Sequence, residues 1–303
     1  MTARHGLYGQ PPLELAVPPA GAAQCSPLSP GAQPIEAFAD ESLESFTLLA
    51  PPGAVERRYV LAQALRALAP GGRLEALAPK DKGGARLKRE LEAFGCTVVE
   101  TARRHHRICA AQRPQTLLGL EAAIAEGAPR LHPGLGLWTQ PGVFSWDRLD
   151  PGTALLVQHL PALAGRGADL GAGLGVLAHA VLASPKVSAL ALVELDGRAV
   201  EAARRNVDDA RATVIWADAR SLGDRLADLD FVVMNPPFHD GGREDRALGQ
   251  AFIAEAARML RKGGTCWLVA NRHLPYEAAL QAQFARVQPV AEAGGFKVFE
   301  ARK

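Results

Sequence analysis

The sequence lacks paired cysteines, long apolar runs and a large share of aromatic residues. Its 303 residues include only four cysteines, at positions 25, 96, 109 and 266, and no two of them form a C-x-x-C pair. This spacing excludes the usual zinc motifs, so we expect no metal, and isolated thiols are typical of a reduced, cytoplasmic protein. No run approaches the roughly 20 apolar residues of a membrane helix. The Pro-rich start lacks the basic and apolar regions of a signal peptide, so we expect neither a membrane nor a secreted protein.

The chain is long enough for two domains, and its composition is that of a globular protein, with 48% hydrophobic and 22% charged residues. Residues 1–34 are rich in proline and are predicted to be extended or partly disordered. A compact α/β segment over 35–118 is predicted to form the first domain, with a connector over 119–149. From 150 to 303, short apolar strands alternate with longer helices, which predicts a doubly wound, mostly parallel sheet.

The formal net charge of +2 hides an uneven distribution. Thirteen Lys or Arg residues stand against six acids between positions 56 and 113, an excess of seven that leaves the rest of the chain net acidic. Arg103, Arg104 and Arg107 form the densest part of this segment. Such a surface would follow the phosphates of RNA, although a solvated face of an ordinary domain remains the alternative.

A glycine-rich loop stands between a predicted strand and a predicted helix. It reads Asp169-Leu-Gly171-Ala-Gly173-Leu-Gly175, and glycines at such a turn let a ligand approach the backbone closely. The third glycine comes one residue too early for the dinucleotide fingerprint, and the carboxylate at 169 disfavours a diphosphate but suits a cationic ligand. Further carboxylates close the next two strands. We therefore predict that S-adenosylmethionine, rather than NAD, is bound by Asp169, Gly171, Gly173, Gly175, Glu194, Asp218 and Asn235.

The tetrapeptide Asn235-Pro236-Pro237-Phe238 follows another predicted strand. The Asn235 side-chain oxygen and the Pro236 carbonyl could accept both hydrogens of a planar exocyclic amine, and the Phe238 ring could stack on the base that carries it. Pro237 and His239 would then lie against the same base. His239 could also take a proton from the amine or simply cap the loop, and the whole tetrapeptide could be an ordinary rigid turn.

Three landmarks repeat with a nearly constant separation of 185 to 192 residues. The segment 49–53 corresponds to 234–238, the segment 68–72 to 260–264, and Phe94 to Phe284. Ala50 takes the place of Asn235 in the first copy, and no glycine loop precedes it. The repeat predicts that the first domain is a shortened, degenerate copy of the second, without its early strands.

The second domain resembles the bacterial ribosomal RNA guanine-N2 methyltransferases, and the small-subunit (16S rRNA) type more than the large-subunit type. The resemblance is carried by the segments 141–144, 169–175, 235–241, 269–271 and 274–276. It implies a Rossmann-like class I S-adenosylmethionine-dependent fold behind a non-catalytic methyltransferase-like domain. It also implies that Asn235 and Pro236 accept the guanine amine, that Phe238 stacks on the base, and that Asp169, Gly171, Gly173, Glu194, Asp218 and Asn235 line the cofactor pocket.

The function expected from these features is S-adenosylmethionine-dependent methylation of the exocyclic amine of a guanine in ribosomal RNA, most simply 16S rRNA of the small subunit. The first domain would dock the RNA. Alternatives within the same chemistry are a guanine of 23S rRNA, an adenine or a protein glutamine. A ribosome-assembly protein that binds RNA without catalysis is the alternative from another class.

Overall fold

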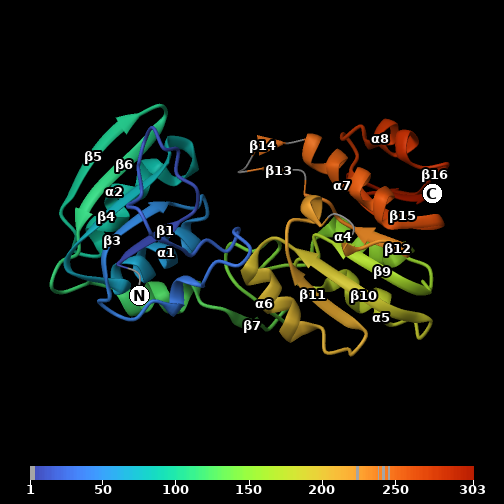
Figure 1. Ribbon diagram of the computed structural model, residues 1–303, viewed down its shortest axis with the longest axis horizontal. Helices are drawn as coiled ribbons and strands as arrows, with labels where there is room; N and C mark the ends of the chain where they lie inside the picture. The colour runs from blue at the N-terminus through green and yellow to red at the C-terminus, as the bar shows by residue number, and fades with distance from the viewer. Residues whose placement is uncertain (1–3, 223–224, 238, 241–242, 245) are drawn as a thin grey trace. The chain divides into compact units, whose positions relative to one another are not determined.

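The computed structural model describes residues 4–222, 225–237, 239–240, 243–244 and 246–303 (Figure 1). The chain forms two compact units. The first comprises residues 1–130 with 140–142, and the second comprises 131–139 with 143–303. No helix among the described residues is long and apolar enough to cross a membrane.

The second unit is built on a seven-stranded sheet with the order β11-β10-β9-β12-β15-β17-β16. The first five of these strands are parallel, whereas β17 runs antiparallel to both of its neighbours. The strands are β9 (Gly165–Leu170), β10 (Val187–Glu194), β11 (Ala212–Trp216), β12 (Leu229–Met234), β15 (Leu260–Asn271), β16 (Arg286–Ala293) and β17 (Phe296–Arg302). The predicted Rossmann-like α/β fold of the C-terminal part is confirmed.

Helices cover both faces of this sheet because its central strands are apolar on both sides. Ala168 and Leu170 pack with α7 and α8, whereas Val233 and its neighbours pack with α4 and α5. The helices are α4 (Pro151–His159), α5 (Val176–Leu182), α6 (Gly197–Asn206), α7 (Arg246–Met259) and α8 (Tyr276–Gln283). Continuous apolar strands of this kind are typical of parallel sheets, which are buried on both faces. The strands therefore end together at one edge of the sheet, where ligands bind in such folds.

The first unit repeats this plan with six strands in the order β2-β1-β3-β4-β6-β5. Its strands are β1 (His5–Tyr8), β2 (Ala23–Gln24), β3 (Leu43–Leu49), β4 (Leu68–Pro79), β5 (Val98–Arg103) and β6 (His106–Gln112). Its helices are α1 (Ala54–Ala67), α2 (Ala85–Ala93) and α3 (Leu120–Gly127). Read from β2 to β5, this order matches the second unit read from β10 to β16, including the antiparallel pairs at the end. The first unit is thus a second, degenerate methyltransferase-like domain.

The start of the chain differs from the prediction. The proline content places residues 1–34 outside the first domain and leaves that domain without its early strands. Instead, β1 pairs in parallel with both β2 and β3, and Tyr8 and Cys25 are buried in the core. Strands of four and two residues are too short to show a periodicity, and their pairing partners lie about 20 and 40 residues away.

The predicted connector over 119–149 also contains regular structure. The helix α3 packs Ala123 into the core of the first unit. It is followed by β7 (Arg130–His132) and β8 (Leu137–Thr139), which pair with each other. The many glycines and prolines of this stretch hide these short elements from the sequence pattern.

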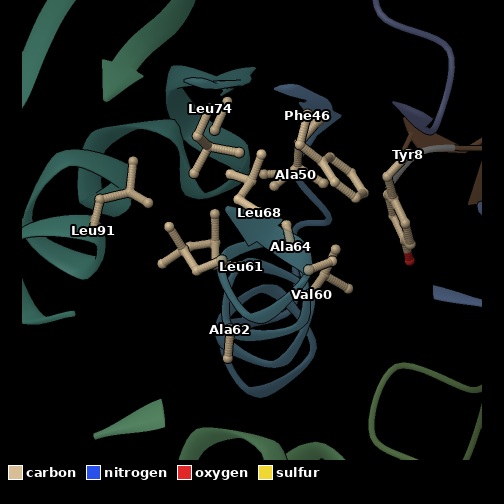
Figure 2. Packing of buried hydrophobic residues seen from close by; sticks show 14 of the residues in the cluster. Tyr8, Phe46, Ala50, Val60, Leu61, Ala62, Ala64, Leu68, Leu74 and Leu91 are labelled. Atoms are coloured by element: carbon tan, nitrogen blue, oxygen red, sulfur yellow. The ribbon is translucent and has the colours of Figure 1, made fainter. Parts of the chain in front are cut away.

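The core of the first unit shows what has replaced the site of the second. Figure 2 shows Ala50 beside Phe46 and Leu68, inside the cluster formed by β3, β4 and α1. Ala50 is 5% exposed, so an apolar side chain fills the position that corresponds to Asn235.

All four cysteines of the chain are buried and free. Desolvation raises the pKa of Cys96 to about 11 and that of Cys109 to about 12. Such thiols are inert.

Candidate functional site

The glycine loop joins β9 to α5 and lies against the end of β10. The backbone N–H groups of Gly171 and Ala172 both donate to the Val193 carbonyl, at 2.9 and 3.1 Å. Gly173 has a φ of +53°, and a Cβ added there would meet nothing within 4 Å, so the loop is open to a ligand at this point. Gly175 differs, because a Cβ there would lie 2.6 Å from Val207 Cγ2. Gly175 is therefore required for packing against the residue that follows α6.

Glu194 closes β10 and holds the glycine loop in place. One carboxylate oxygen accepts the N–H of Gly173 and the other accepts the N–H of Asp196, both at 2.8 Å. Desolvation by burial nevertheless raises the pKa of Glu194, against the effect of these backbone hydrogen bonds. Each carboxylate oxygen can accept a second hydrogen bond. Glu194 can thus support the loop and still receive the hydroxyls of a ligand.

Asp169 is fully buried at the end of β9. Neither of its carboxylate oxygens accepts a hydrogen bond from a described residue. Desolvation, followed by the charge of Glu194, raises the pKa of Asp169 to about 8. An unpartnered buried carboxylate is costly unless a ligand, an ion or a proton completes the site.

Asp218 is already engaged within the chain. Its side chain caps the short helix of residues 219–221 by accepting the N–H of Arg220, and it forms an ion pair with the guanidinium of the same residue at 2.6 Å. The hydrogen bond from Arg220 is the main cause of the lowered pKa of Asp218. Asp218 does not line the pocket described next, so a role in cofactor binding stays a prediction.

A pocket brings together the glycine loop, the end of β12 and the start of α4. Of the predicted site residues, it contains Gly171, Gly173 and Asn235. Its other lining residues include polar groups that the sequence did not assign to the site, namely Ser145, Arg148, Asp150 and Thr153. The predicted glycine loop and the Asn-Pro-Pro segment are therefore neighbours, although about 60 residues separate them in sequence.

Asn235 is held in this pocket by two acceptors from α4. Its Nδ2 donates to Asp150 Oδ2 at 2.8 Å and to Thr153 Oγ1 at 2.9 Å. The sequence pattern identifies Asp150 only as the residue that begins a helix. No local pattern links it to Asn235, because the two residues are 85 positions apart.

The remaining residues of the tetrapeptide have distinct positions. Pro236 is buried and Pro237 is exposed, and Pro237 Cδ lies 3.9 Å from the Cβ position of Gly171. Phe238, the predicted stacking residue, lies outside the described residues. His239 is described only as the first residue of β13 (His239–Asp240), which pairs with β14 (Arg243–Glu244).

The aromatic residues near the pocket divide into packing and exposed groups. Trp138 packs against α6, with the Arg205 guanidinium 4.7 Å from its ring centroid. Asn206 donates to the carbonyls of Trp138 and Leu174, both at 3.0 Å, and accepts the Trp138 N–H at 2.7 Å. Asn206 thus joins β8 to the glycine loop. In contrast, Phe144 is 58% exposed at the pocket wall.

The basic residues predicted to bind RNA gather at the tip of the β5–β6 hairpin. Arg103, Arg104 and Arg107 line one shallow depression together with Lys80, His105 and His106. Two of them carry partners, since Arg104 pairs with Glu14 at 2.6 Å and Arg107 with Glu100 at 3.3 Å. Elsewhere in the unit, Arg58, Arg66 and Arg113 pair with acids outside the 56–113 segment. The hairpin tip therefore gathers a cluster of basic side chains, of which Arg104 and Arg107 are ion-paired.

The first unit has filled the counterpart of the Asn-Pro-Pro site with its own side chain. Arg57 of α1 donates from Nη1 to the carbonyls of Pro51 at 3.2 Å and Pro52 at 2.8 Å. Its other nitrogens form a two-point contact with Glu90 at 2.7 Å. The guanidinium is 1% exposed, so these carbonyls are not available to a substrate amine.

These features define the class of the protein. A doubly wound sheet with a glycine loop after β9, a carboxylate at the end of β10 and Asn-Pro-Pro after β12 is a Rossmann-like methyltransferase architecture. The chain belongs to the methyltransferase small domain family, whose model matches residues 134–300. No group of three or more His, Cys, Asp or Glu side chains within the described part of the chain is arranged to hold a metal ion.

Known relatives bear out the resemblance noted in the sequence. A protein named Ribosomal RNA small subunit methyltransferase C, from Shewanella sp. (strain MR-4), is 35% identical over 158 residues, which are 52% of this chain and 46% of that protein. The protein of the same name from Hahella chejuensis is 36% identical over 168 residues, or 55% and 49% of the two chains. The chain spans about half the length of the curated relatives it matches.

One solved structure resembles the whole chain. The T. thermophilus 16S rRNA N2 methyltransferase RsmC, solved in complex with AdoMet and guanosine, matches with a TM-score of 0.77 and 26% sequence identity. The match covers 100% of this chain and 89% of that one. The two-domain organisation of the chain is therefore shared with a solved protein.

Proposed function

We propose that this protein uses S-adenosylmethionine to methylate the exocyclic amine of a guanine in ribosomal RNA, with 16S rRNA of the small subunit as the target. The observation that carries this proposal is the state of Asn235. Both hydrogens of its Nδ2 are taken up by Asp150 and Thr153, which leaves Oδ1 as the atom that can receive a substrate amine. The relatives and the solved structure described above support the choice of guanine and of small-subunit RNA. This function places the protein in the cytoplasm, with ribosomal RNA or the small subunit as its partner.

The residues present fit S-adenosylmethionine. A cationic ligand would favour the ionised form of the buried, unpartnered Asp169 side chain, and the open face at Gly173 allows close approach to the backbone. Glu194 keeps free acceptor capacity for a ribose diol beside the same loop. Gly171, Gly173, Glu194 and Asp169 would hold the cofactor. When bound, it supplies an electrophilic methyl group on a positively charged sulfur.

The chain contributes mainly positioning to this chemistry. Asn235 Oδ1 and the Pro236 carbonyl would accept the two amine hydrogens, and Phe238 is the predicted stacking ring for the base. With both hydrogens held, the nitrogen lone pair is turned away from the acceptors and toward the methyl group. The bound cofactor would supply the methyl carbon for the new C–N bond and keep the electron pair on its sulfur, and the amine would lose one proton to water. Holding the reacting atoms in this way is a large source of rate enhancement.

The hairpin tip supports a role of the first unit in RNA docking. It presents Lys80, Arg103, Arg104 and Arg107 within one depression, and the counterpart of the amine site in that unit is closed by Arg57. A domain whose acceptors are occupied by its own side chain but that presents a cluster of basic side chains is suited to binding the RNA backbone.

The test is labelled methyl transfer to small and large ribosomal subunits that lack the modification, followed by analysis of the methylated nucleoside. We expect N2-methylguanosine in the RNA of the small subunit. Asn235→Ala should lower the transfer rate at least about 100-fold because an acceptor used in the transition state is lost. Cofactor binding, measured by calorimetry, should remain within a few-fold.

Gln288→Ala is the matched control, since it truncates an exposed amide on the edge strand β16. Full turnover by the Asn235→Ala variant would refute the role assigned to Asn235. Methylated adenosine or glutamine as the product would instead redirect the proposal to another planar amine.

A further inference from the structure

We propose that Asp150 and Thr153 are positioning residues that fix the Asn235 amide in the orientation that methyl transfer requires. The proposal rests on the function proposed above. The geometry is a three-residue cluster in which Asn235 Nδ2 donates to Asp150 Oδ2 and to Thr153 Oγ1. Neither Asp150 nor Thr153 is marked as a site residue by the sequence, and both line the same pocket as the glycine loop.

The chemistry of the partners decides which way the amide points. An asparagine side chain can be rotated by 180° to exchange its oxygen and its nitrogen, and the two arrangements have nearly the same shape. An ionised carboxylate only accepts hydrogen bonds. The atom of Asn235 that faces Asp150 must therefore be Nδ2, because Oδ1 in that place would face another oxygen. Thr153 Oγ1 accepts the second hydrogen. Because a hydroxyl can also donate, Asp150 is the partner that decides the orientation and Thr153 adds a second anchor.

Asp150 is itself fixed by the start of α4. The same Oδ2 atom accepts the N–H of Thr153 at 2.7 Å, so one oxygen serves both as the helix cap and as the anchor of Asn235. The first turn of α4 cannot shift easily, because a Cβ at Gly152 would lie 2.8 Å from the Phe296 ring of β17. Leu156, one turn further along α4, is fully buried in the core. The orientation of the amide is thus tied to the packing of a helix on the sheet.

Suitable substitutions separate the effect of the hydrogen bonds to Asn235 from the effect of the helix cap. Asp150→Ser keeps an oxygen that can cap α4, but its shorter side chain does not reach Asn235. Thr153→Val keeps the backbone N–H and the shape of the side chain while removing the acceptor Oγ1. Asp150→Asn keeps an oxygen that can accept from both Thr153 and Asn235. A control is Thr139→Val, which removes a buried hydroxyl that has no partner among the described residues.

We expect Asp150→Ser to lower kcat by about tenfold or more and Thr153→Val by about threefold, as for the loss of one hydrogen bond each. KM for the RNA substrate and the Kd of S-adenosylmethionine should change little. Asp150→Asn should recover most of the lost rate, and Thr139→Val should match the wild type. Thermal unfolding identifies any variant that loses activity only because its fold is destabilised.

A second readout does not depend on catalysis. In protein labelled with ¹⁵N at asparagine, the side-chain NH₂ signals of Asn235, identified by their absence in Asn235→Ala, should exchange slowly with solvent. Asp150→Ser and Thr153→Val should speed this exchange and shift the signals. Wild-type kcat and wild-type exchange in both variants would overturn the positioning role. An inactive wild-type protein with slow Asn235 exchange would instead count against the proposed function alone.

Discussion

At the residue scale, Asp169 makes the stability of the fold depend on pH. Its pKa is about 8 in the folded protein, whereas the ordinary value for an aspartate side chain is 3.8, so folding takes up a proton between these values. Between about pH 4 and 8 the free energy of unfolding should fall as pH rises, by up to about 1.4 kcal/mol per pH unit from this group. Below about pH 4 the carboxyl is protonated in both the folded and the unfolded state, and its cost disappears.

Asp169→Asn should therefore stabilise the protein at pH 8 and have a smaller effect at pH 5. Urea unfolding of both proteins at a series of pH values measures the difference. Asp209→Asn is the control of opposite sign. The hydrogen bond from Arg211 lowers the pKa of Asp209 to about 2, so its stabilising effect is lost only as pH falls through the range from about 4 to 2. A difference for Asp169→Asn that does not change between pH 5 and 8 would contradict the assignment.

Single residues also show where sequence reasoning reaches its limit. The loop at 171–175 and Asn235 could be predicted because strand ends and turn residues are recognisable locally. Asp150 could not, because its contact with Asn235 depends on how α4 packs on the sheet. Likewise, nothing in the spacing showed that Arg220 would bind the carboxylate of Asp218, or that Gly175 would be required by Val207.

At the scale of elements, α1 places Arg57 against the carbonyls of Pro51 and Pro52, which are the first unit's counterpart of the Asn-Pro-Pro segment. This side chain is 1% exposed and its partner Glu90 is 13% exposed. Arg57→Met should cost about 3–5 kcal/mol of stability because it leaves a buried carboxylate without a partner. Arg57→Lys should recover only part of this loss, since a single ammonium cannot reproduce the two-point contact.

The neighbouring residue provides the control for this prediction. Arg58 pairs with Glu126, but both side chains are close to half exposed, so Arg58→Met should cost at most about 1 kcal/mol. Replacing Arg57 and Glu90 together by Met and Leu should be milder than Arg57→Met alone. Thermal and urea unfolding measure the free energy of unfolding of each variant. Equal losses of stability for Arg57→Met and Arg58→Met would show that the buried Arg57–Glu90 pair contributes no more than an exposed pair.

The elements that the sequence predicted best are those with a clear period and clear ends. The alternation of strands and helices over 150–303 was predicted in this way, and α6, for example, begins at a cap formed by Asp196. The strands β1, β2, β7 and β8 were missed because each has at most four residues. The stability of such strands comes from distant neighbours and not from their own pattern. The repeat was recognised from three turns, whereas its full extent became visible only in the strand order.

At the scale of the whole molecule, the net charge of +2 conceals an uneven distribution of charged residues. The excess of basic residues over 56–113 is partly balanced by acids elsewhere in the first unit, because Arg58, Arg66 and Arg113 have acidic partners outside that segment. The tip of the β5–β6 hairpin gathers a further group of basic side chains. There, Arg103 forms no ion pair with a described residue, whereas Arg104 and Arg107 would have to release Glu14 and Glu100 in order to bind a phosphate.

This arrangement predicts unequal effects on RNA binding. Arg103→Gln should weaken binding to small-subunit RNA the most, because Arg103 has no ion pair with a described residue that RNA binding would have to break. It should also make the slope of log K against log salt concentration shallower by about 0.7–0.9, the value for one phosphate contact. Arg104→Gln and Arg107→Gln should each weaken binding less. In the wild-type protein these arginines must first break an ion pair, which offsets part of the binding free energy of their phosphate contacts.

Arg286→Gln on β16 is the control, because it removes the same charge from the second unit and should leave the slope unchanged. Filter binding between about 50 and 200 mM salt, the range in which such contacts dominate, measures all four variants. If Arg286→Gln weakened binding as much as Arg103→Gln, the RNA would be attracted by the charge of the whole molecule and not by the hairpin.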